Sequence, residues 1–273
     1  MSFVFRVLSV WPLGLLHALG AVLGWLAFLG SPPYRQRVID NARRAGYRFA
    51  RIRGAVAQAG CLSAELPRLW LGAPVPLQWD GAEWIDAART HGRGLIFLTP
   101  HLGCFEVTAQ GYAARYGTIT VLYRPARQPW LRAVLERSRA RPGLATAPTT
   151  LAGVKQMLKA LRAGEAVGLL PDQTPPEGMG LWSPFFGSPA YTMTLSVRLA
   201  QQSGATVLLA WGERLSWGRG YVIHVRPLCE PLAHGLPEAV AQINREMERL
   251  VRECPSQYLW GYARYKQPRG GEA

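Results

Sequence analysis

Hydrophobic positions along the chain fall into three patterns that predict different structures. Residues 7–30 form one apolar run, with His17 as its single titratable group. Over residues 34–72, apolar residues recur every three to four positions, which predicts amphipathic helices. From residue 94 onward, short apolar runs alternate with segments of helical periodicity. The chain therefore begins with an apolar helix, continues with helices, and ends with alternating strands and helices.

The alternating part predicts the fold class. The predicted strands are 94–99, 118–123, 166–171, 205–211 and 221–227. The predicted helices lie near 83–90, 105–116, 129–140, 150–163, 191–203 and 237–253. Strands that are apolar throughout are typical of a sheet covered on both faces. We therefore expect an α/β fold with a mostly parallel or mixed sheet covered by helices, in which sites lie at the carboxyl ends of strands.

The first apolar run predicts a membrane helix. Its length matches the roughly 20 apolar residues that cross a bilayer, and it is longer than the apolar region of a signal peptide. Seven arginines and one acid, Asp40, follow it between residues 35 and 53, whereas only Arg6 precedes it. The positive-inside rule then places the rest of the chain on the cytoplasmic face. The competing interpretation is a buried core helix. We predict three parts: a membrane anchor at 1–30, a basic helical membrane-proximal segment at 31–75, and an α/β domain at 76–273.

Composition narrows the class of partner. Charged residues make up 18% of the chain, below the roughly 25% of ordinary soluble domains, and the net charge is +14. A basic, apolar chain favours an anionic membrane surface, although an acidic protein would also be attracted. No basic and aromatic interleaving indicates nucleic acid. The four cysteines lack metal-ligand spacing and no phosphate-binding loop is present, so we expect no metal and no cofactor.

The segment "TPHLGCFEV" (99–107) follows a predicted buried strand and carries candidate chemistry. Five residues along one helix would place His101 and Glu106 about 140° apart, so they could not touch. They can pair if His101 lies in the loop and Glu106 in the first turns of the helix behind it. The carboxylate would then bind one imidazole nitrogen, leaving the other as a general base for a hydroxyl that the substrate brings. The competing interpretation is a helix-capping histidine with a solvated glutamate.

Five segments together resemble a known family. "TPHLGCFEV" resembles the H-x(4)-D/E block of glycerolipid-type acyltransferases. With the segments that follow it in order, the sequence resembles the lipid A biosynthesis lauroyl and myristoyl acyltransferases. These segments are "LYRPARQPWL" (122–131), "GVKQMLKALRAGEAVGLLPDQ" (153–173), "SPFFGSPAYT" (183–192) and "CPSQYLWGYARYKQPRG" (254–270). Tyr262 departs from the family, in which histidine is common at this place.

The resemblance implies transfer of a fatty acyl chain from acyl carrier protein to a hydroxyl of a lipid A precursor at the inner membrane. His101 and Glu106 are then the expected catalytic residues, and backbone amides near Gly103 are the expected oxyanion donors. The expected substrate-binding residues are Arg124 and Arg264 for phosphate, with Asp172 and Gln173 in the same pocket. The competing interpretations are that Arg124 is a surface residue, that Asp172 caps a helix or turn, and that Arg264 is solvated. Two other functions stay open: the same chemistry on a glycolipid, an ornithine-type lipid or a lysophospholipid, and a non-catalytic membrane-bound homologue.

Overall fold

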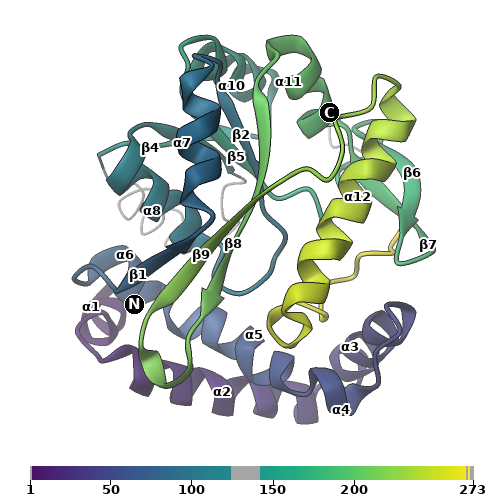
Figure 1. The fold of residues 1–273 in the computed structure, drawn as a ribbon. Coiled ribbons are helices and arrows are strands. Elements are labelled where there is room, and N and C mark those ends of the chain that lie inside the picture. The colour runs from purple at the N-terminus through teal and green to yellow at the C-terminus, as the bar shows by residue number, and fades with distance from the viewer. Residues whose placement is uncertain (1, 124–141, 269, 271–273) are drawn as a thin grey trace.

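A seven-stranded mixed sheet forms the centre of the molecule (Figure 1). The computed structural model describes residues 2–123, 142–268 and 270. The strands follow the spatial order β1 (Leu77–Asp80), β9 (Tyr221–Pro227), β8 (Thr206–Arg214), β2 (Leu95–Leu98), β5 (Ala166–Leu169), β3 (Ile119–Tyr123) and β4 (Leu144–Pro148). Among the described strands of this sheet, β8 and β9 pair antiparallel and the other neighbours pair parallel. A separate hairpin, β6 (Gly180–Phe185) and β7 (Ser188–Met193), lies beside the sheet.

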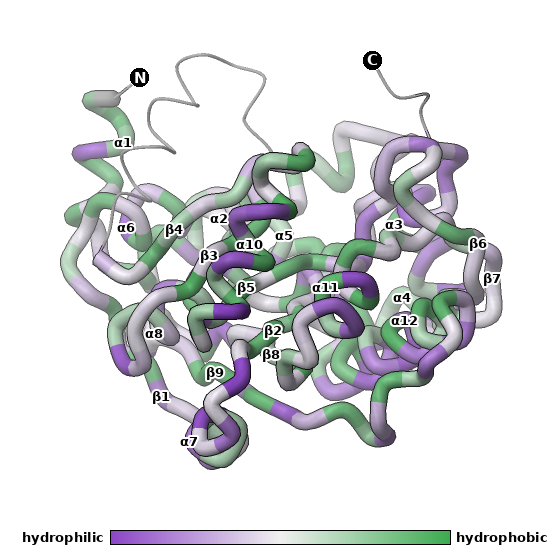
Figure 2. Tube along the Cα trace, turned by 90° about the horizontal axis from the view of Figure 1, so that it is seen from above, coloured by the Kyte–Doolittle hydropathy of each residue, from purple (hydrophilic) through white to green (hydrophobic). Residues whose placement is uncertain are grey.

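Helices cover both faces of this sheet, as the apolar strands predict. On one face, α7 (Ala82–Thr90) and α8 (Glu106–Tyr116) pack on Leu95, Phe97 and Ala210. On the other face, α10 (Leu151–Arg162), α11 (Leu195–Ser203) and α12 (Leu236–Glu253) pack on alternate residues of the same strands. β2, β5 and β8 run through the middle of these layers (Figure 2). Both faces are therefore dry, which explains why β2 and β5 are buried at every position.

A layer of short helices closes the end of the sheet to which the parallel strands point. It consists of α1 (Ser2–Ser9), α2 (Leu13–Gly30), α3 (Pro32–Arg44), α4 (Phe49–Ile52), α5 (Gly54–Ala64) and α6 (Leu66–Leu71). After the end of β8 at Arg214, the short turn η1 (Ser216–Gly218) packs against Gly14 of α2. Figure 1 shows the β8–β9 turn reaching α2 along the lower edge of the molecule. The carboxyl ends of β2, β5 and β8 therefore face this helical layer.

Two helices of the layer, α2 and α5, meet through their backbones. A methyl group added at Gly60 of α5 would lie 1.9 Å from the carbonyl oxygen of Gly20, and one added at Gly24 would lie 2.2 Å from that of Val56. Real side chains do not tolerate such approaches. A methyl group added at Gly20 would lie 2.6 Å from the Cα atom of Cys61, so glycine at these three positions lets α2 and α5 pack at close range.

The α2 helix is long and apolar enough to cross a membrane by length and composition, and it is the one such helix among the described residues. One face of it is buried against α5, and the opposite face is exposed. Neither the anchor nor the boundaries at residues 30 and 75 are tested by this arrangement, so both stay predictions.

Most of the predicted elements are confirmed. The five predicted strands are present within three residues at each end, and residues 34–72 are helical in four segments. The helix predicted at 191–203 is wrong at its start, because Tyr191–Met193 pair with β6 before α11 begins. The sequence also misses β1, β4 and the β6–β7 hairpin, which are short and largely polar or half-buried. The helix predicted at 129–140 lies outside the described residues.

A buried ion pair joins the helical layer to the sheet. Glu65, at the junction of α5 and α6, accepts hydrogen bonds from Nε of Arg214 at 2.7 Å and from the Tyr221 hydroxyl at 2.9 Å. His17 of α2 contacts the same carboxylate at 3.1 Å. Burial alone would raise the pKa of Glu65, but the charge and hydrogen bonds of Arg214 outweigh it and lower the pKa from 4.5 to about 2. The carboxylate is therefore ionised at neutral pH although it is fully buried.

We predict that Glu65→Gln lowers the free energy of unfolding at pH 7 by about 3–5 kcal/mol, because it leaves the Arg214 charge buried without a counterion. The folded pKa is depressed, so the contribution of Glu65 is present above pH 4.5 and is lost as the pH falls toward 2. Urea unfolding across this range should show the loss in the wild type and not in the variant. Asp40→Asn, which removes an exposed partner of Arg43 at 3.6 Å, serves as control and should change little. Equal unfolding free energies for the two variants at pH 7 would contradict the role of the pair.

Candidate active site

His101 is held in a loop between β2 and α8, three residues beyond the end of the strand. Its carbonyl accepts a hydrogen bond from the backbone of Leu259 at 3.0 Å. Gly103 follows in the left-handed region at φ +60°, where a Cβ would lie 2.0 Å from the carbonyl oxygen of Gly212. Glycine is thus required for the loop to pass against β8. The backbone around the imidazole is fixed from both sides.

The partner of the imidazole is Asp172. Its Oδ1 lies 2.7 Å from Nδ1 of His101, and its Oδ2 accepts the His101 backbone N–H at 2.8 Å and the Tyr258 hydroxyl at 3.3 Å. Asp172 is 2% exposed. Burial alone would raise its pKa, but the charge that His101 carries when protonated, the hydrogen bonds of His101 and the charge of Arg264 outweigh burial and lower the pKa of Asp172 from its ordinary value. The group is therefore an ionised carboxylate that only accepts hydrogen bonds.

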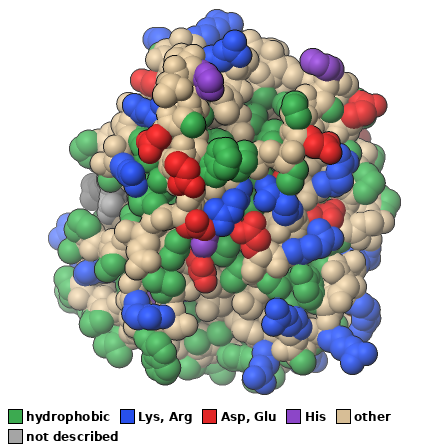
Figure 3. Space-filling model, viewed as in Figure 1, with side chains coloured by type: hydrophobic (Ala, Val, Ile, Leu, Met, Phe, Trp, Pro, Cys, Tyr) green, Lys and Arg blue, Asp and Glu red, His purple; other side chains and the backbone are tan. Residues whose placement is uncertain are grey.

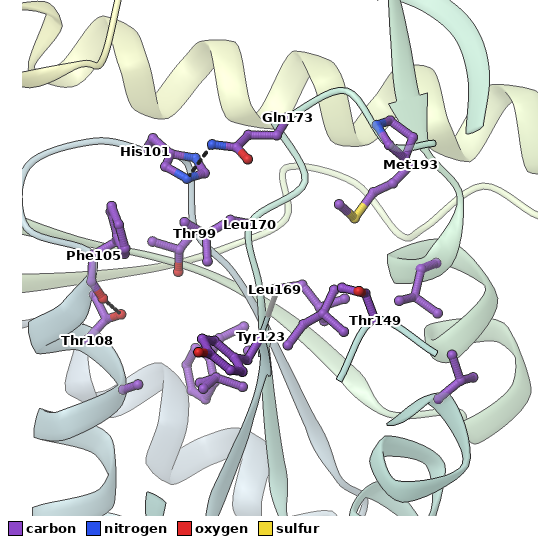
Figure 4. Close-up of a pocket in the computed structure, with 18 of the residues that line it drawn as sticks. Thr99, His101, Phe105, Thr108, Tyr123, Thr149, Leu169, Leu170, Gln173 and Met193 are labelled. Carbon is purple, nitrogen blue, oxygen red and sulfur yellow. Dashed lines mark hydrogen bonds between the residues drawn. The ribbon is translucent and has the colours of Figure 1, made fainter. Parts of the chain in front are cut away.

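This carboxylate decides the imidazole tautomer. Because it accepts from Nδ1–H, the neutral ring keeps its lone pair on Nε2. Nε2 lies 2.9 Å from the side-chain nitrogen of Gln173, whose N–H donates to that lone pair as the amide is oriented. Figure 4 shows the imidazole and the Gln173 amide facing each other at one end of a cavity. The basic nitrogen thus points toward the cavity rather than into the protein.

Glu106 does not bind either imidazole nitrogen, so the expected pairing with His101 is wrong. It is the first residue of α8, and its Oε2 accepts the indole N–H of Trp70 at 3.3 Å. The helix begins one residue later than expected, while Asp172 follows the neighbouring strand β5 and binds Nδ1 instead. Glu106 nevertheless lines the same cavity as the imidazole. Its catalytic role stays a prediction.

Two expected oxyanion donors are already engaged. The Gly103 N–H donates to the carbonyl of Gln257 at 3.0 Å, and the Cys104 N–H donates to that of Gly212 at 2.7 Å. These hydrogen bonds shape the loop and connect it to β8 and to the C-terminal segment. They leave neither amide pointing at a substrate.

Of the two arginines expected to bind phosphate, only Arg264 lies among the described residues. Arg264 is 2% exposed and donates to the carbonyl of Tyr191 at 2.7 Å and to the Thr192 hydroxyl at 2.6 Å. Its guanidinium thus joins the C-terminal segment to β7, and the solvated interpretation is wrong. Arg124 lies outside the described residues. The Tyr262 hydroxyl accepts the backbone N–H of Thr174 at 3.0 Å and so supports the segment after Gln173.

A cavity of about 990 Å³ extends from the imidazole. One part is lined by apolar residues of the sheet and of α8: Phe97, Ala109, Tyr112, Ile119, Val121, Ala210, Ile223 and Val225. A second part runs past the ends of β4, β5 and β7, lined by residues that include Thr149, Leu170, Met193 and Thr194. Arg198 and Lys266, both exposed, contribute cations to its lining. The cavity therefore combines a base, an apolar interior and positive charge.

The sequence did not identify three groups around this site. Tyr258, Leu259 and Gln257 all come from the C-terminal segment and fix Asp172, His101 and Gly103 respectively. That segment was singled out by resemblance, but nothing in its spacing indicates which residue it contacts. Among the described residues, no group of three or more His, Cys, Asp and Glu side chains could hold a metal ion.

Comparison with known proteins gives the family. Residues 49–267 match the family of bacterial lipid A biosynthesis acyltransferases. The chain is 28% identical over 193 residues to the lipid A biosynthesis lauroyltransferase of Escherichia coli strain K12. The matched region covers 70% of this chain and 62% of that protein. It is 26% identical to the palmitoleoyltransferase of the same strain, over 71% of this chain and 63% of that protein. It is also 26% identical to the lipid A biosynthesis myristoyltransferase of that strain, over 79% of this chain and 67% of that protein.

These matches span less than two thirds of the length of the first two relatives. The matched region contains the imidazole, its carboxylate partner and the cavity residues from β1 to Lys266. Since the match covers most of the chain, the family is shown: this chain belongs to the bacterial lipid A biosynthesis acyltransferases.

Proposed function

We propose that this protein transfers a fatty acyl chain from the thioester of acyl carrier protein to a hydroxyl of a lipid A precursor. The observation that carries the proposal is an imidazole whose tautomer is set by a buried carboxylate and whose basic nitrogen faces an apolar cavity. Acyl transfer to an alcohol needs a base for the hydroxyl proton and a dry place for the acyl chain. Both lie in one site here.

The proposed reaction uses His101 as general base. The acceptor oxygen attacks the thioester carbonyl carbon while Nε2 takes the hydroxyl proton. Asp172 stabilises the imidazolium that forms and keeps Nδ1 protonated. The tetrahedral intermediate then collapses, the carbon–sulfur bond breaks, and the departing thiolate takes the proton from Nε2. An ester and a free thiol result, and the imidazole returns to its starting tautomer.

Gln173 and Glu106 have separate roles in this proposal. The Gln173 amide occupies the Nε2 lone pair at 2.9 Å, so the acceptor hydroxyl must displace it before proton transfer. Glu106 lines the cavity from α8, where its carboxylate would accept a hydrogen bond from the acceptor and align the attacking oxygen. In this assignment Asp172 is a positioning residue, and Glu106 acts on the substrate rather than on the ring.

The cavity suits the two substrates at different ends. The apolar interior between α8 and the sheet would take the acyl chain, since burying it there removes hydrocarbon from water. Arg198 and Lys266 would attract the phosphates of the lipid acceptor or of phosphopantetheine. Arg124, which follows β3 directly in the sequence, is proposed for the same purpose. The protein would work at the cytoplasmic face of the inner membrane.

We predict that His101→Ala and Asp172→Asn each lower kcat/KM for acyl transfer by about 10²–10⁴-fold. The first removes the base, and the second removes the acceptor that keeps the proton on Nδ1. The measurement is steady-state transfer by purified enzyme, with circular dichroism to show that each variant is folded. Gln173→Ala serves as control and should retain most of its turnover, because this amide only covers the base. A folded Asp172→Asn enzyme of wild-type activity, combined with an inactive Glu106→Gln, would refute the assignment of the orienting carboxylate.

The acceptor is tested in cells. We expect lipid A from a deletion strain to lack one acyl chain by mass spectrometry, and a plasmid carrying the wild type but not His101→Ala to restore it. Transfer by the purified enzyme from acyl carrier protein and from acyl coenzyme A, at equal concentrations, identifies the donor. Unchanged lipid A together with a deficit of another acylated lipid would contradict the proposed acceptor and keep the chemistry. Unchanged lipids of every class would favour a non-catalytic homologue.

A further inference from the structure

Two opposite stripes divide the surface of α2 along its full length. The inward stripe, spaced three to four residues apart, is buried: Leu13, Leu16, Gly20, Gly24 and Phe28. The outward stripe has the same spacing and is 37–62% exposed: Leu15, Leu19, Val22, Leu26 and Leu29. An isolated interfacial helix has a polar face turned away from lipid. In α2 the face opposite the outward stripe is apolar instead, and α5 covers it.

The inward stripe holds α2 flat against the rest of the protein from end to end. Near its start, a methyl group added at Gly14 would lie 3.2 Å from the carbonyl oxygen of Trp217. Near its end, the ring of Phe28 stacks on that of Phe49 at 5.1 Å. In between, the backbones of Gly20, Gly24 and Gly60 approach closely. A helix crossing a bilayer would have to leave all of these contacts.

Three further exposed apolar residues lie in the segments that adjoin α2. Phe3 and Val10 of the α1 region are 76% and 73% exposed. Trp217, in the η1 turn packed on the start of α2, is 91% exposed and lies in the left-handed region at φ +63°. A tryptophan in water with such a backbone is doubly unfavourable, whereas tryptophan is enriched where proteins meet the membrane interface. Together with the outward stripe, these three residues form a surface that we call the apolar plate.

Positive charge lies at both ends of the apolar plate. Arg6 lies in α1, and Arg48, Arg51 and Arg53 are exposed in and beside α4, just beyond the end of α2. Residues 1–64 contain eight arginines and one acid, Asp40. Figure 3 shows hydrophobic side chains along the lower edge of the molecule, over α1 and α2, with Lys and Arg side chains gathered at its lower right. An apolar surface with a basic rim is complementary to an anionic bilayer.

We propose that the apolar plate inserts into the headgroup region of an anionic leaflet with α2 parallel to the bilayer plane, so that α2 attaches the protein without spanning. This deepens the proposed function and relies on it only for the choice of membrane. The carboxyl ends of the parallel strands face the same helical layer. The layer that carries the apolar plate thus also faces the strand ends beyond which His101 and Asp172 lie.

Depth measurement along α2 tests the orientation. Leu15→Cys, Val22→Cys and Leu29→Cys, each in a Cys229→Ser/Cys254→Ser background, would carry one spin label per protein on vesicles of phosphatidylethanolamine and phosphatidylglycerol. The two end positions are about 21 Å apart along the helix at 1.5 Å per residue. Flat attachment predicts similar, shallow depths at all three positions. A deep central label between two labels at opposite interfaces would show spanning and overturn the proposal.

Binding measurements test the plate and its rim. Val22→Glu/Leu26→Glu alters two exposed side chains of the outward stripe and should weaken vesicle binding by about tenfold or more. Trp84→Glu, on the exposed side of α7, is the matched control and should bind as the wild type does. Vesicles of phosphatidylcholine alone should bind about tenfold less than anionic ones. Unimpaired binding by the double variant, or no preference for anionic vesicles, would overturn the proposal. None of these assays involves acyl transfer, so a failed function and a failed orientation are separate results.

Discussion

The ion pair between Glu65 and Arg214 holds together three parts of this molecule: the helical layer, the sheet and the loop that carries His101. Arg214 ends β8, its guanidinium binds Glu65 of the helical layer, and it also donates to the carbonyl of Gly103 at 3.2 Å, two residues beyond the proposed base. Its backbone and the Gln257 side chain exchange two hydrogen bonds, at 2.9 and 3.0 Å. Burying two charges costs desolvation energy that only good geometry offsets. The pair therefore fixes one arrangement of layer, sheet and loop, because any other would leave a charge unpaired.

The candidate site depends on this arrangement and on strand adjacency. β2 and β5 are parallel neighbours, and His101 and Asp172 each lie three residues beyond the end of their strand. Neighbouring strands are roughly 5 Å apart, so groups at equal distances beyond their ends come within reach of each other. Seventy-one residues of sequence separate the two side chains, yet the sheet sets them 2.7 Å apart. The C-terminal segment then adds the Tyr258 hydroxyl and the Leu259 amide that hold both in place.

The sequence predicts the fold class, most strands and the loop position of His101, because these follow from local periodicity and from motifs at strand ends. Of the two residues expected in the substrate pocket, Gln173 lines the cavity, whereas Asp172 is buried and does not. The sequence does not predict which carboxylate binds the imidazole. Glu106 is near in sequence, but the order of strands in the sheet places Asp172 closer, and spacing carries no record of strand order. Burial of Arg264 was missed for a similar reason, since its partners Tyr191 and Thr192 are more than 70 residues away. β1 and β4 were missed because they are the edge strands of the sheet and are only partly buried, so their hydrophobic pattern is weak.

The glycine contact between α2 and α5 has a consequence for how this sequence can diverge. Because the helices meet backbone to backbone, the contact depends on the absence of side chains at Gly20, Gly24 and Gly60 rather than on complementary shapes. The outward stripe contributes nothing to it. In descendants of this sequence, the three glycines should stay invariant, while Leu15, Leu19, Val22, Leu26 and Leu29 interchange freely with other apolar residues. The outward face of α2 can thus change in sequence with its surroundings while the packing of α2 on α5 is kept.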